Sequence, residues 1–202
     1  MGTKRTTVLA VLLLSAATGA AAQVTSLPPP NQTVLQDIAA AQTFQERVNQ
    51  YVTLHRLLEG PLPPLRPSRD MTEIQASTRA LALRIQLARA NARQGELITA
   101  DVAPLFRRHI ATCLRPEEWA AIFANNAEDE EDGRIGPPPT LYVNMEWPEN
   151  VSFGFVPPQL LAALPRLPAE LQYRIIGSTL VLWDHHANLI VDFLPDAFPV
   201  TT

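Results

Sequence analysis

Three apolar runs near the C-terminal end of the chain constrain the fold most strongly. Residues 171–176, 179–184 and 189–194 are rich in leucine, β-branched and aromatic side chains, and two short turn-like segments separate them. Runs of this length joined by tight turns are typical of a three-stranded antiparallel meander. Such a sheet has one apolar face, which should pack on helices.

The turn lengths predict which residues of the meander face each other. A two-residue first turn places Tyr173 opposite Leu182, and a four-residue second turn places Leu182 opposite Val191. The opposite, mixed face of the sheet should bring Arg174 close to Asp192. The apolar face predicted to cover the core comprises Tyr173, Ile175, Leu180, Leu182, Leu189, Val191 and Phe193.

The region upstream, residues 34–126, has the pattern of a helical unit. Apolar residues recur at three- and four-residue steps from Val34 to Gly60, and this glycine should end the first helix in a left-handed conformation. Asp70 and Glu73 have the spacing of a capping box, which predicts the start of a second helix.

The second helix should end at Gly95, and two shorter helices are expected at residues 101–112 and from Pro116 onward. Residues 127–140 form an acidic and proline-rich linker. Its run of five carboxylates, Glu128–Asp132, is self-repelling and therefore predicts a solvated segment.

The remaining segments complete the predicted organisation. Residues 23–33 are a polar, proline-rich lead-in predicted to be disordered, and residues 141–202 form the C-terminal meander unit, with short strands at 141–143 and 151–156. We expect residues 34–202 to form one compact domain of the α+β class, in which an antiparallel helical unit packs against the small sheet.

The first 22 residues have the three parts of a secretory signal peptide. Lys4 and Arg5 form a basic start, residues 8–17 form a short apolar run, and cleavage is expected between Ala22 and Gln23. An apolar run of about ten residues is too short to span a bilayer. The sequence therefore predicts a protein exported to the periplasm or the medium, with no transmembrane segment after removal of the signal.

Composition excludes several functional classes. The chain of 202 residues has a formal net charge of −4, which argues against a nucleic-acid partner because such proteins carry a basic face. One cysteine excludes a disulfide scaffold and the multi-cysteine metal motifs. The sequence contains no glycine-rich loop for a phosphate, and we predict no cofactor.

The segment LQYRIIGSTLVLWDHHANLIVDFLPDA, with LHRLLEGPLPPLRPSRD and ARQGELIT upstream, resembles a family of uncharacterised exported bacterial proteins. This resemblance implies export and a shared fold, without a named activity. The meander by itself is similar to the C-terminal hairpin of small periplasmic proteins of the nickel/cobalt-homeostasis family. That similarity implies a shared architecture only.

The second turn of the meander holds the first candidate binding residues, Asp184, His185 and His186. With Ala187 they match the signature of the DHH phosphoesterases, whose acids and histidines hold divalent metals, but the upstream Asp-x-Asp pair of that family is missing. Adjacent histidines converge with Asp184 only in a turn. The competing interpretation is a polar turn in which Asp184 binds backbone groups, and no metal site is assigned.

Two histidines in the helical unit have a partner four residues away. His55 and Glu59 lie at the end of the first helix, where a cationic histidine is favoured by the helix dipole. His109 and Cys113 have the spacing of a nucleophile with its base, of half a metal site, or of a buried structural pair. The unpaired Cys113 is also a candidate for linking two chains into a homodimer.

The sequence assigns no catalytic residue. The expected function is that of a non-catalytic exported bacterial protein that acts through an envelope or protein partner. The alternative is a hydrolase or a metal-binding module whose site gathers the Asp184–His186 turn with His55 or Glu59. The two hypotheses differ in whether that turn approaches the end of the first helix.

Overall fold

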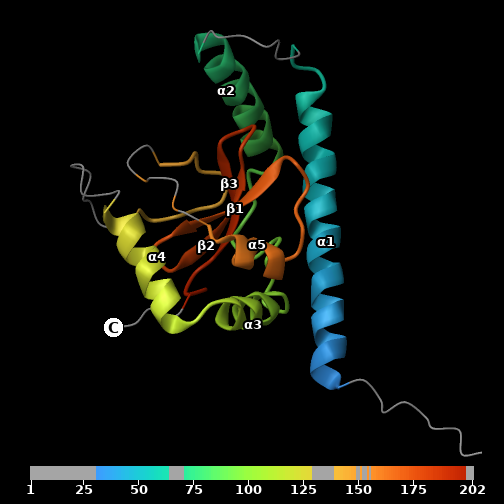
Figure 1. The fold of residues 1–202 in the computed structure, drawn as a ribbon. Coiled ribbons are helices and arrows are strands. Elements are labelled where there is room, and N and C mark those ends of the chain that lie inside the picture. Colours follow the sequence, from blue (N-terminus) through green and yellow to red (C-terminus); the bar gives the residue numbers. More distant parts are fainter. Residues whose placement is uncertain are drawn as a thin grey trace, which may run out of the picture. The chain divides into compact units, whose positions relative to one another are not determined.

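The computed structural model describes residues 31–63, 71–128, 139–148, 151, 154 and 156–198. The predicted signal peptide, most of the lead-in, Asp70 and residues 129–138 of the acidic linker lie outside the described residues. The elements in chain order are α1 (Gln32–Glu59), α2 (Met71–Ala88), α3 (Ala103–Cys113), α4 (Pro116–Glu128), α5 (Pro158–Ala163), β1 (Leu171–Ile176), β2 (Thr179–Asp184) and β3 (Leu189–Leu194) (Figure 1).

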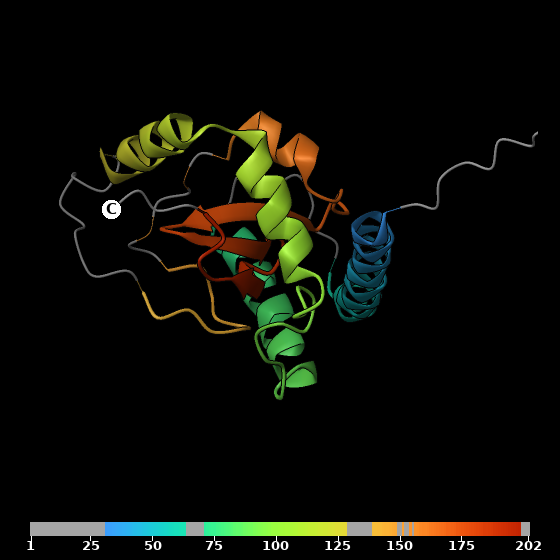
Figure 2. The same cartoon turned by 90° about the horizontal axis from the view of Figure 1, so that it is seen from below.

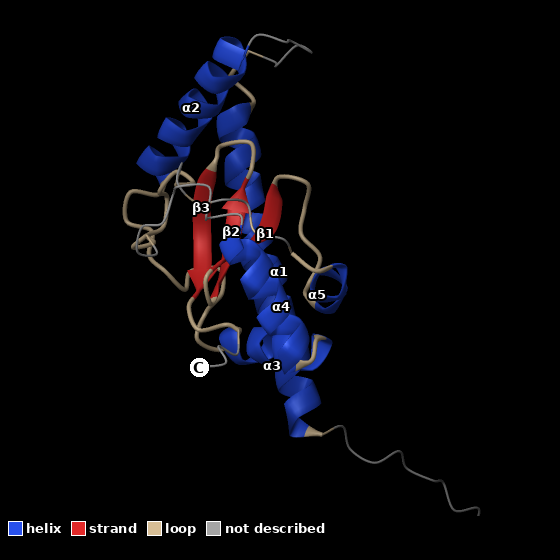
Figure 3. Ribbon diagram, turned by 60° about the vertical axis from the view of Figure 1, so that its left-hand side comes forward, coloured by secondary structure: helices blue, strands red, loops and turns tan. Residues whose placement is uncertain are grey.

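The fold belongs to the α+β class, as the sequence predicts. The helices precede a three-stranded sheet in the order β1-β2-β3, and both strand pairs are antiparallel. The three strands lie side by side in Figure 3. The first hairpin has the predicted register, with Tyr173 opposite Leu182 and Ile175 opposite Leu180. Gly177 in its turn has a φ of 53°, a conformation that glycine adopts without steric cost.

The second hairpin departs from the predicted register at a β-bulge. Next to the turn the pairs are Asp184 with Leu189 and Trp183 with Ile190, but the following pair is Leu182 with Asp192. Val191 is therefore an extra residue in β3. The predicted pairing of Leu182 with Val191 is wrong.

The bulge also changes which side chains share a face. Phe193 pairs with Val181 and packs in the second, smaller cluster, so its predicted place on the main core face is wrong. Leu194 pairs with Leu180 and takes that place in the main core.

Asp192 does not approach Arg174, contrary to the predicted pairing of these two residues. The buried Asp192 carboxylate accepts hydrogen bonds from the backbone N–H groups of Gly95, Leu97 and Ile98, at 2.8, 2.8 and 2.9 Å. Arg174 instead donates to Gln172, and its guanidinium lies 5.2 Å from the ring centroid of Trp183. Asp192 thus fixes the loop between α2 and α3 against β3.

The main core joins one face of the sheet to α1, α2 and α3. Phe44, Ile85 and Phe106 from these helices are fully buried in a cluster that includes Tyr173 and Leu182. The ring centroids of Phe106 and Tyr173 lie 6.1 Å apart, and Figure 2 shows α3 crossing the sheet. This packing fixes α1 next to the end of β2.

Several predicted boundaries differ from the observed ones. Gly60 has a φ of −51° and a ψ of −39°, so it continues the right-handed helix and is not a left-handed cap. α2 ends at Ala88, seven residues before Gly95, since the chain turns there toward the loop that Asp192 holds. Residues 141–148 form no strand; Glu146 makes a single bridge to Leu189. Among the described residues, no helix is long and apolar enough to cross a membrane.

Candidate functional site

The C-terminal half of α1 presents three polar side chains to the turn between β2 and β3. Tyr51, His55 and Glu59 are spaced four residues apart, which places them on one face of the helix. The turn carries His185 and His186, directly after Asp184 at the end of β2. The helical unit and the sheet therefore meet through these side chains.

The Asp184 carboxylate connects the helix to the turn. It is fully buried, and its Oδ2 atom accepts hydrogen bonds from the hydroxyl of Tyr51 and from Nδ1 of His55, both at 2.6 Å. Its Oδ1 atom accepts from the backbone N–H groups of His186, at 3.0 Å, and Ala187, at 2.9 Å. One carboxylate thus orients the His55 ring directly and places His186 through the turn. The predicted role of Asp184 in binding turn backbone groups is present alongside the contact with α1.

The contact between Asp184 and His55 shifts the pKa of both side chains. Burial by itself would raise the pKa of Asp184, but the hydrogen bond and the charge of His55 outweigh it, and the pKa is lowered. Burial would likewise lower the pKa of His55, yet the hydrogen bond to Asp184 and the charges of Asp184, Glu59 and Glu170 raise it. Both shifts favour a charged pair, with the proton on Nδ1 facing Asp184.

The opposite ring nitrogen of His55, Nε2, faces Glu59, which also contacts His186. Nε2 of His55 lies 3.3 Å from Oε2 of Glu59, and Nδ1 of His186 lies 3.2 Å from Oε1 of the same carboxylate. One ligand atom from each residue lies within 4.8 Å of the other two. We call His55, Glu59 and His186 the His–Glu–His cluster.

The His–Glu–His cluster combines one buried ligand with two accessible ones. The side chain of His55 is fully buried, whereas His186 and Glu59 retain 38% and 42% of their exposure. Within the part of the chain that the structure describes, the buried Nε2 atom of His55 makes no hydrogen bond. A buried polar atom left without a hydrogen bond is unusual and calls for an explanation.

Glu170 is a further buried carboxylate, which contacts both α1 and the turn. Its Oε1 atom accepts a hydrogen bond from Nε of Arg56, at 2.6 Å, and its backbone carbonyl accepts from the N–H of His185, at 3.2 Å. Its buried Oε2 atom has no hydrogen-bond partner among the described residues. Burial would raise the pKa of Glu170, but Arg56 lowers it and keeps the carboxylate ionised.

His185 and His186 have different surroundings, although both were candidates. His186 contacts Glu59 in the cluster, whereas Nε2 of His185 donates to the carbonyl of Ala169 at 2.7 Å. The structure therefore brings together Asp184, His186 and His55 with Glu59, and leaves His185 outside the cluster.

His109 and Cys113 bind separate backbone carbonyls. Nδ1 of His109 contacts the carbonyl of Ala163, and the Cys113 thiol donates to the carbonyl of Ile110 at 3.2 Å. Burial raises the pKa of Cys113, which disfavours the thiolate needed for nucleophilic attack. These contacts favour the structural interpretation of the pair.

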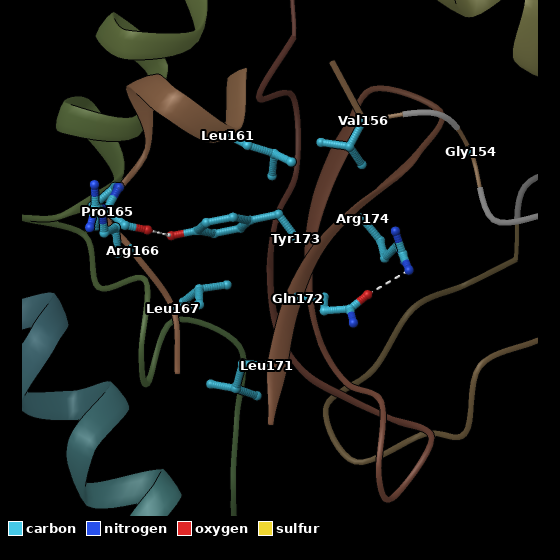
Figure 4. A pocket seen from close by; sticks show the side chains of 10 residues that line it. All are labelled: Gly154, Val156, Leu161, Pro165, Arg166, Leu167, Leu171, Gln172, Tyr173 and Arg174. Atoms are coloured by element: carbon cyan, nitrogen blue, oxygen red, sulfur yellow. Dashed lines mark hydrogen bonds between the residues drawn. The ribbon is translucent and has the colours of Figure 1, made fainter. Parts of the chain in front are cut away.

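A cavity of about 580 Å³ lies elsewhere, beside β1. Figure 4 shows apolar side chains such as Leu161 and Leu171 around it, with the Tyr173 hydroxyl donating to the carbonyl of Pro165. Arg174 donates to Gln172 in the same view. The Tyr173, Gln172 and Arg174 groups are thus used in bonds within the chain, and Arg166 also lines the cavity.

Sequence reasoning found part of this site. It named His55, Glu59, Asp184 and His186 but not Tyr51, although the four-residue spacing of Tyr51 from His55 was a usable signal. Glu170 gives no such signal, because it lies just before a strand and reaches the site only through the fold.

The comparisons with known proteins indicate no function for this chain. No protein family model, no curated protein and no solved structure matches this chain. The resemblances to exported bacterial proteins and to the nickel/cobalt-homeostasis family stay predictions.

Proposed function

We propose that this chain is an exported bacterial protein that binds one divalent transition-metal ion in the His–Glu–His cluster. The sequence raised two hypotheses: a protein that acts only through contacts with an envelope or protein partner, and a hydrolase or metal-binding module. The geometry favours metal binding. The observation that carries the proposal is the buried His55 side chain, whose Nε2 atom makes no hydrogen bond among the described residues, lies 3.3 Å from Glu59, and shares a cluster of possible ligands with His186.

The distances in the cluster suit a small cation. In a tetrahedral site with metal–ligand bonds of about 2.0–2.2 Å, neighbouring ligand atoms lie about 3.3–3.6 Å apart. The two contacts to Glu59 are already 3.3 and 3.2 Å. Both imidazoles thus face the same carboxylate, each through a different oxygen.

The ligand types favour zinc, nickel, cobalt or copper. Imidazole nitrogen suits these ions, whereas calcium and magnesium need a shell of oxygen ligands. The bond from His55 Nδ1 to Asp184 is the outer contact that metal-binding histidines usually make, and it presents Nε2 to an ion once that nitrogen has lost the proton it carries in the charged pair. Asp184 would therefore act on the ion through His55.

Zinc titration of the metal-stripped mature chain tests the proposal. We expect one zinc ion per chain by native mass spectrometry and competition with a chromophoric chelator. His55→Ala and His186→Ala should each weaken the zinc affinity about 100-fold or more, since loss of an outer contact alone costs 10–100-fold.

His185→Ala is the matched control, because His185 is adjacent to His186 but lies outside the cluster. It should bind zinc with the affinity of the unaltered chain. Equal losses for His185→Ala and His186→Ala, or no zinc bound at all, would contradict the proposal.

Export and dimerisation are separate proposals with simpler tests. Support for export comes from the signal pattern of residues 1–22, and the exported product should begin at Gln23 by mass. A Cys113-linked homodimer would appear on a non-reducing gel and disappear in the Cys113→Ser variant. The half-buried position of Cys113 would require local opening before such a bond forms.

A further inference from the structure

β1 forms one edge of the sheet, and no described segment pairs with its outer side. The strand order is β1-β2-β3, so β1 and β3 are the two edge strands. The outer edge of β3 is covered, because Ile190 accepts a hydrogen bond from the N–H of Asn144 and donates its own N–H to the carbonyl of Met145, both at 2.8 Å. An edge without such cover is a template for pairing with another chain.

The register of the first hairpin determines which backbone groups of β1 face this edge. Ile176 and Thr179 flank the two-residue turn and form a hydrogen-bonded pair, and bonding to β2 then recurs at every second residue, next at Arg174. The N–H and C=O groups of Tyr173 therefore point away from β2. Among the described residues, no backbone group hydrogen-bonds to them.

The cavity of about 580 Å³ lies along this edge of β1. Four consecutive residues of the strand, Leu171 to Arg174, line it. Because successive side chains of a strand point to opposite faces of the sheet, a cavity can contact all four only where it straddles the edge. Figure 4 shows Tyr173 on one side of β1, and Gln172 and Arg174 on the other.

The two sides of the cavity differ in chemistry. The side chains of Leu161 and Leu167 lie on the Tyr173 side, and Leu161 retains 48% of its exposure. The other side is polar: the side-chain oxygen of Gln172 accepts a hydrogen bond from Arg174 at 2.6 Å, so the Gln172 amide presents N–H donors beside a cationic guanidinium. A strand laid along β1 would therefore meet apolar groups with one set of alternate side chains and donors with the other.

We propose that the free edge of β1 binds an extended segment of a partner protein in which apolar and acidic residues alternate. The segment adds a fourth, antiparallel strand to the sheet. Main-chain bonds to Tyr173 provide affinity, and the two sides of the cavity select the alternate side chains. The sign of the charge follows from the cavity wall, where Arg166 and Arg174 are the charged residues and no described residue is acidic.

Charge disfavours a second copy of this chain as the occupant. Pairing of two β1 strands would bring the arginines of one copy against those of the other, and like charges across paired strands are destabilising. The proposal is independent of the metal site, since none of the His–Glu–His cluster lines this cavity.

Fluorescence anisotropy of a labelled peptide tests the proposal on the mature chain. The probe is a peptide of about six residues that alternates valine and glutamate, the length of an ordinary strand. We expect saturable binding, weakened about 10-fold or more when lysine replaces glutamate. Binding should be equal with and without zinc, so this proposal and the metal site can fail separately.

Methylated peptides separate strand addition from simple charge attraction. Opposite residues of an antiparallel pair share a face, so the valine opposite Tyr173 donates its N–H to the Tyr173 carbonyl. Methylation of the valine nitrogens should weaken binding about 10-fold, because it removes this donor and adds a clash. Methylation of the glutamate nitrogens, which face away from β1, should have little effect. Hydrogen exchange at the Tyr173 amide should slow in the complex.

Leu161→Glu tests the cavity from the side of the protein. A negative charge on the apolar side should weaken binding of the acidic peptide about 10-fold, whereas Leu87→Glu, at an exposed leucine on α2 outside the cavity, should not. The proposal is overturned if the acidic peptide does not bind, or if the lysine or valine-methylated peptide binds equally well. A dimer of the reduced chain that forms without peptide and is lost in Leu161→Glu would assign the edge to a second copy and overturn it as well.

Discussion

Asp184→Ala should lower the free energy of unfolding by about 3–5 kcal/mol, the usual effect of breaking a buried charged pair by removing one partner. The side chain is fully buried and accepts four hydrogen bonds, from Tyr51, His55, His186 and Ala187. Without it, a cationic His55 would be left buried and two backbone N–H groups of the turn would lose their acceptor. Urea denaturation followed by circular dichroism measures the loss.

Asp37→Asn provides the comparison for this experiment. Asp37 pairs with Arg108 at the surface, and such pairs contribute about 1 kcal/mol or less. Zinc should stabilise the unaltered chain and the Asp37→Asn variant by mass action, and should stabilise Asp184→Ala less, because loss of an outer contact weakens zinc affinity about 10–100-fold. If Asp184→Ala costs no more than Asp37→Asn, Asp184 does not connect α1 to the sheet as described here.

Asp192→Ala should be the second most damaging change, with a loss of about 3 kcal/mol, because buried donors left without an acceptor cost about 1–3 kcal/mol each. The N–H groups of Gly95, Leu97 and Ile98 all depend on this carboxylate. Hydrogen exchange at these three amides should accelerate more than exchange in α1.

Zinc affinity gives the control for Asp192. The residue contacts none of the His–Glu–His cluster, so a folded Asp192→Ala chain should bind zinc with an affinity close to that of the unaltered chain. A large loss of zinc affinity in this variant, with the fold intact, would show that the loop and the cluster are coupled in a way that the structure does not explain.

Much of the fold could be predicted from local patterns. The three apolar runs predict β1, β2 and β3, and the two-residue turn at Gly177 sets the first register. The periodicity after Val34 likewise predicts α1. These signals are local, because a turn or a helical repeat depends on neighbours in the chain.

The bulge in β3 had no such signal. Val191 reads as an ordinary alternating strand residue, and the extra residue becomes evident only when Asp192 is seen to hold the loop at Gly95, Leu97 and Ile98. A buried carboxylate with distant backbone partners is a property of the tertiary structure. For that reason the predicted approach of Arg174 to Asp192 failed.

The residues of the candidate site could likewise be predicted from the sequence only in part. His55 and Glu59 share a helix face by spacing alone, and the Asp184–His186 turn is conspicuous in the sequence. That the turn meets α1, and that Glu170 joins them, depends on how the helices pack on the sheet. The choice between His185 and His186 also needed the structure, since adjacent residues in a turn have no fixed directions.

Anomalous diffraction from crystals of the zinc-loaded protein, collected above and below the zinc absorption edge, tests the central claim most directly. We expect one peak about 2.0–2.2 Å from Nε2 of His55, Nδ1 of His186 and a Glu59 oxygen. The peak should be lost in His186→Ala and kept in His185→Ala. A peak at other residues, or none in crystals grown with saturating zinc, would contradict it.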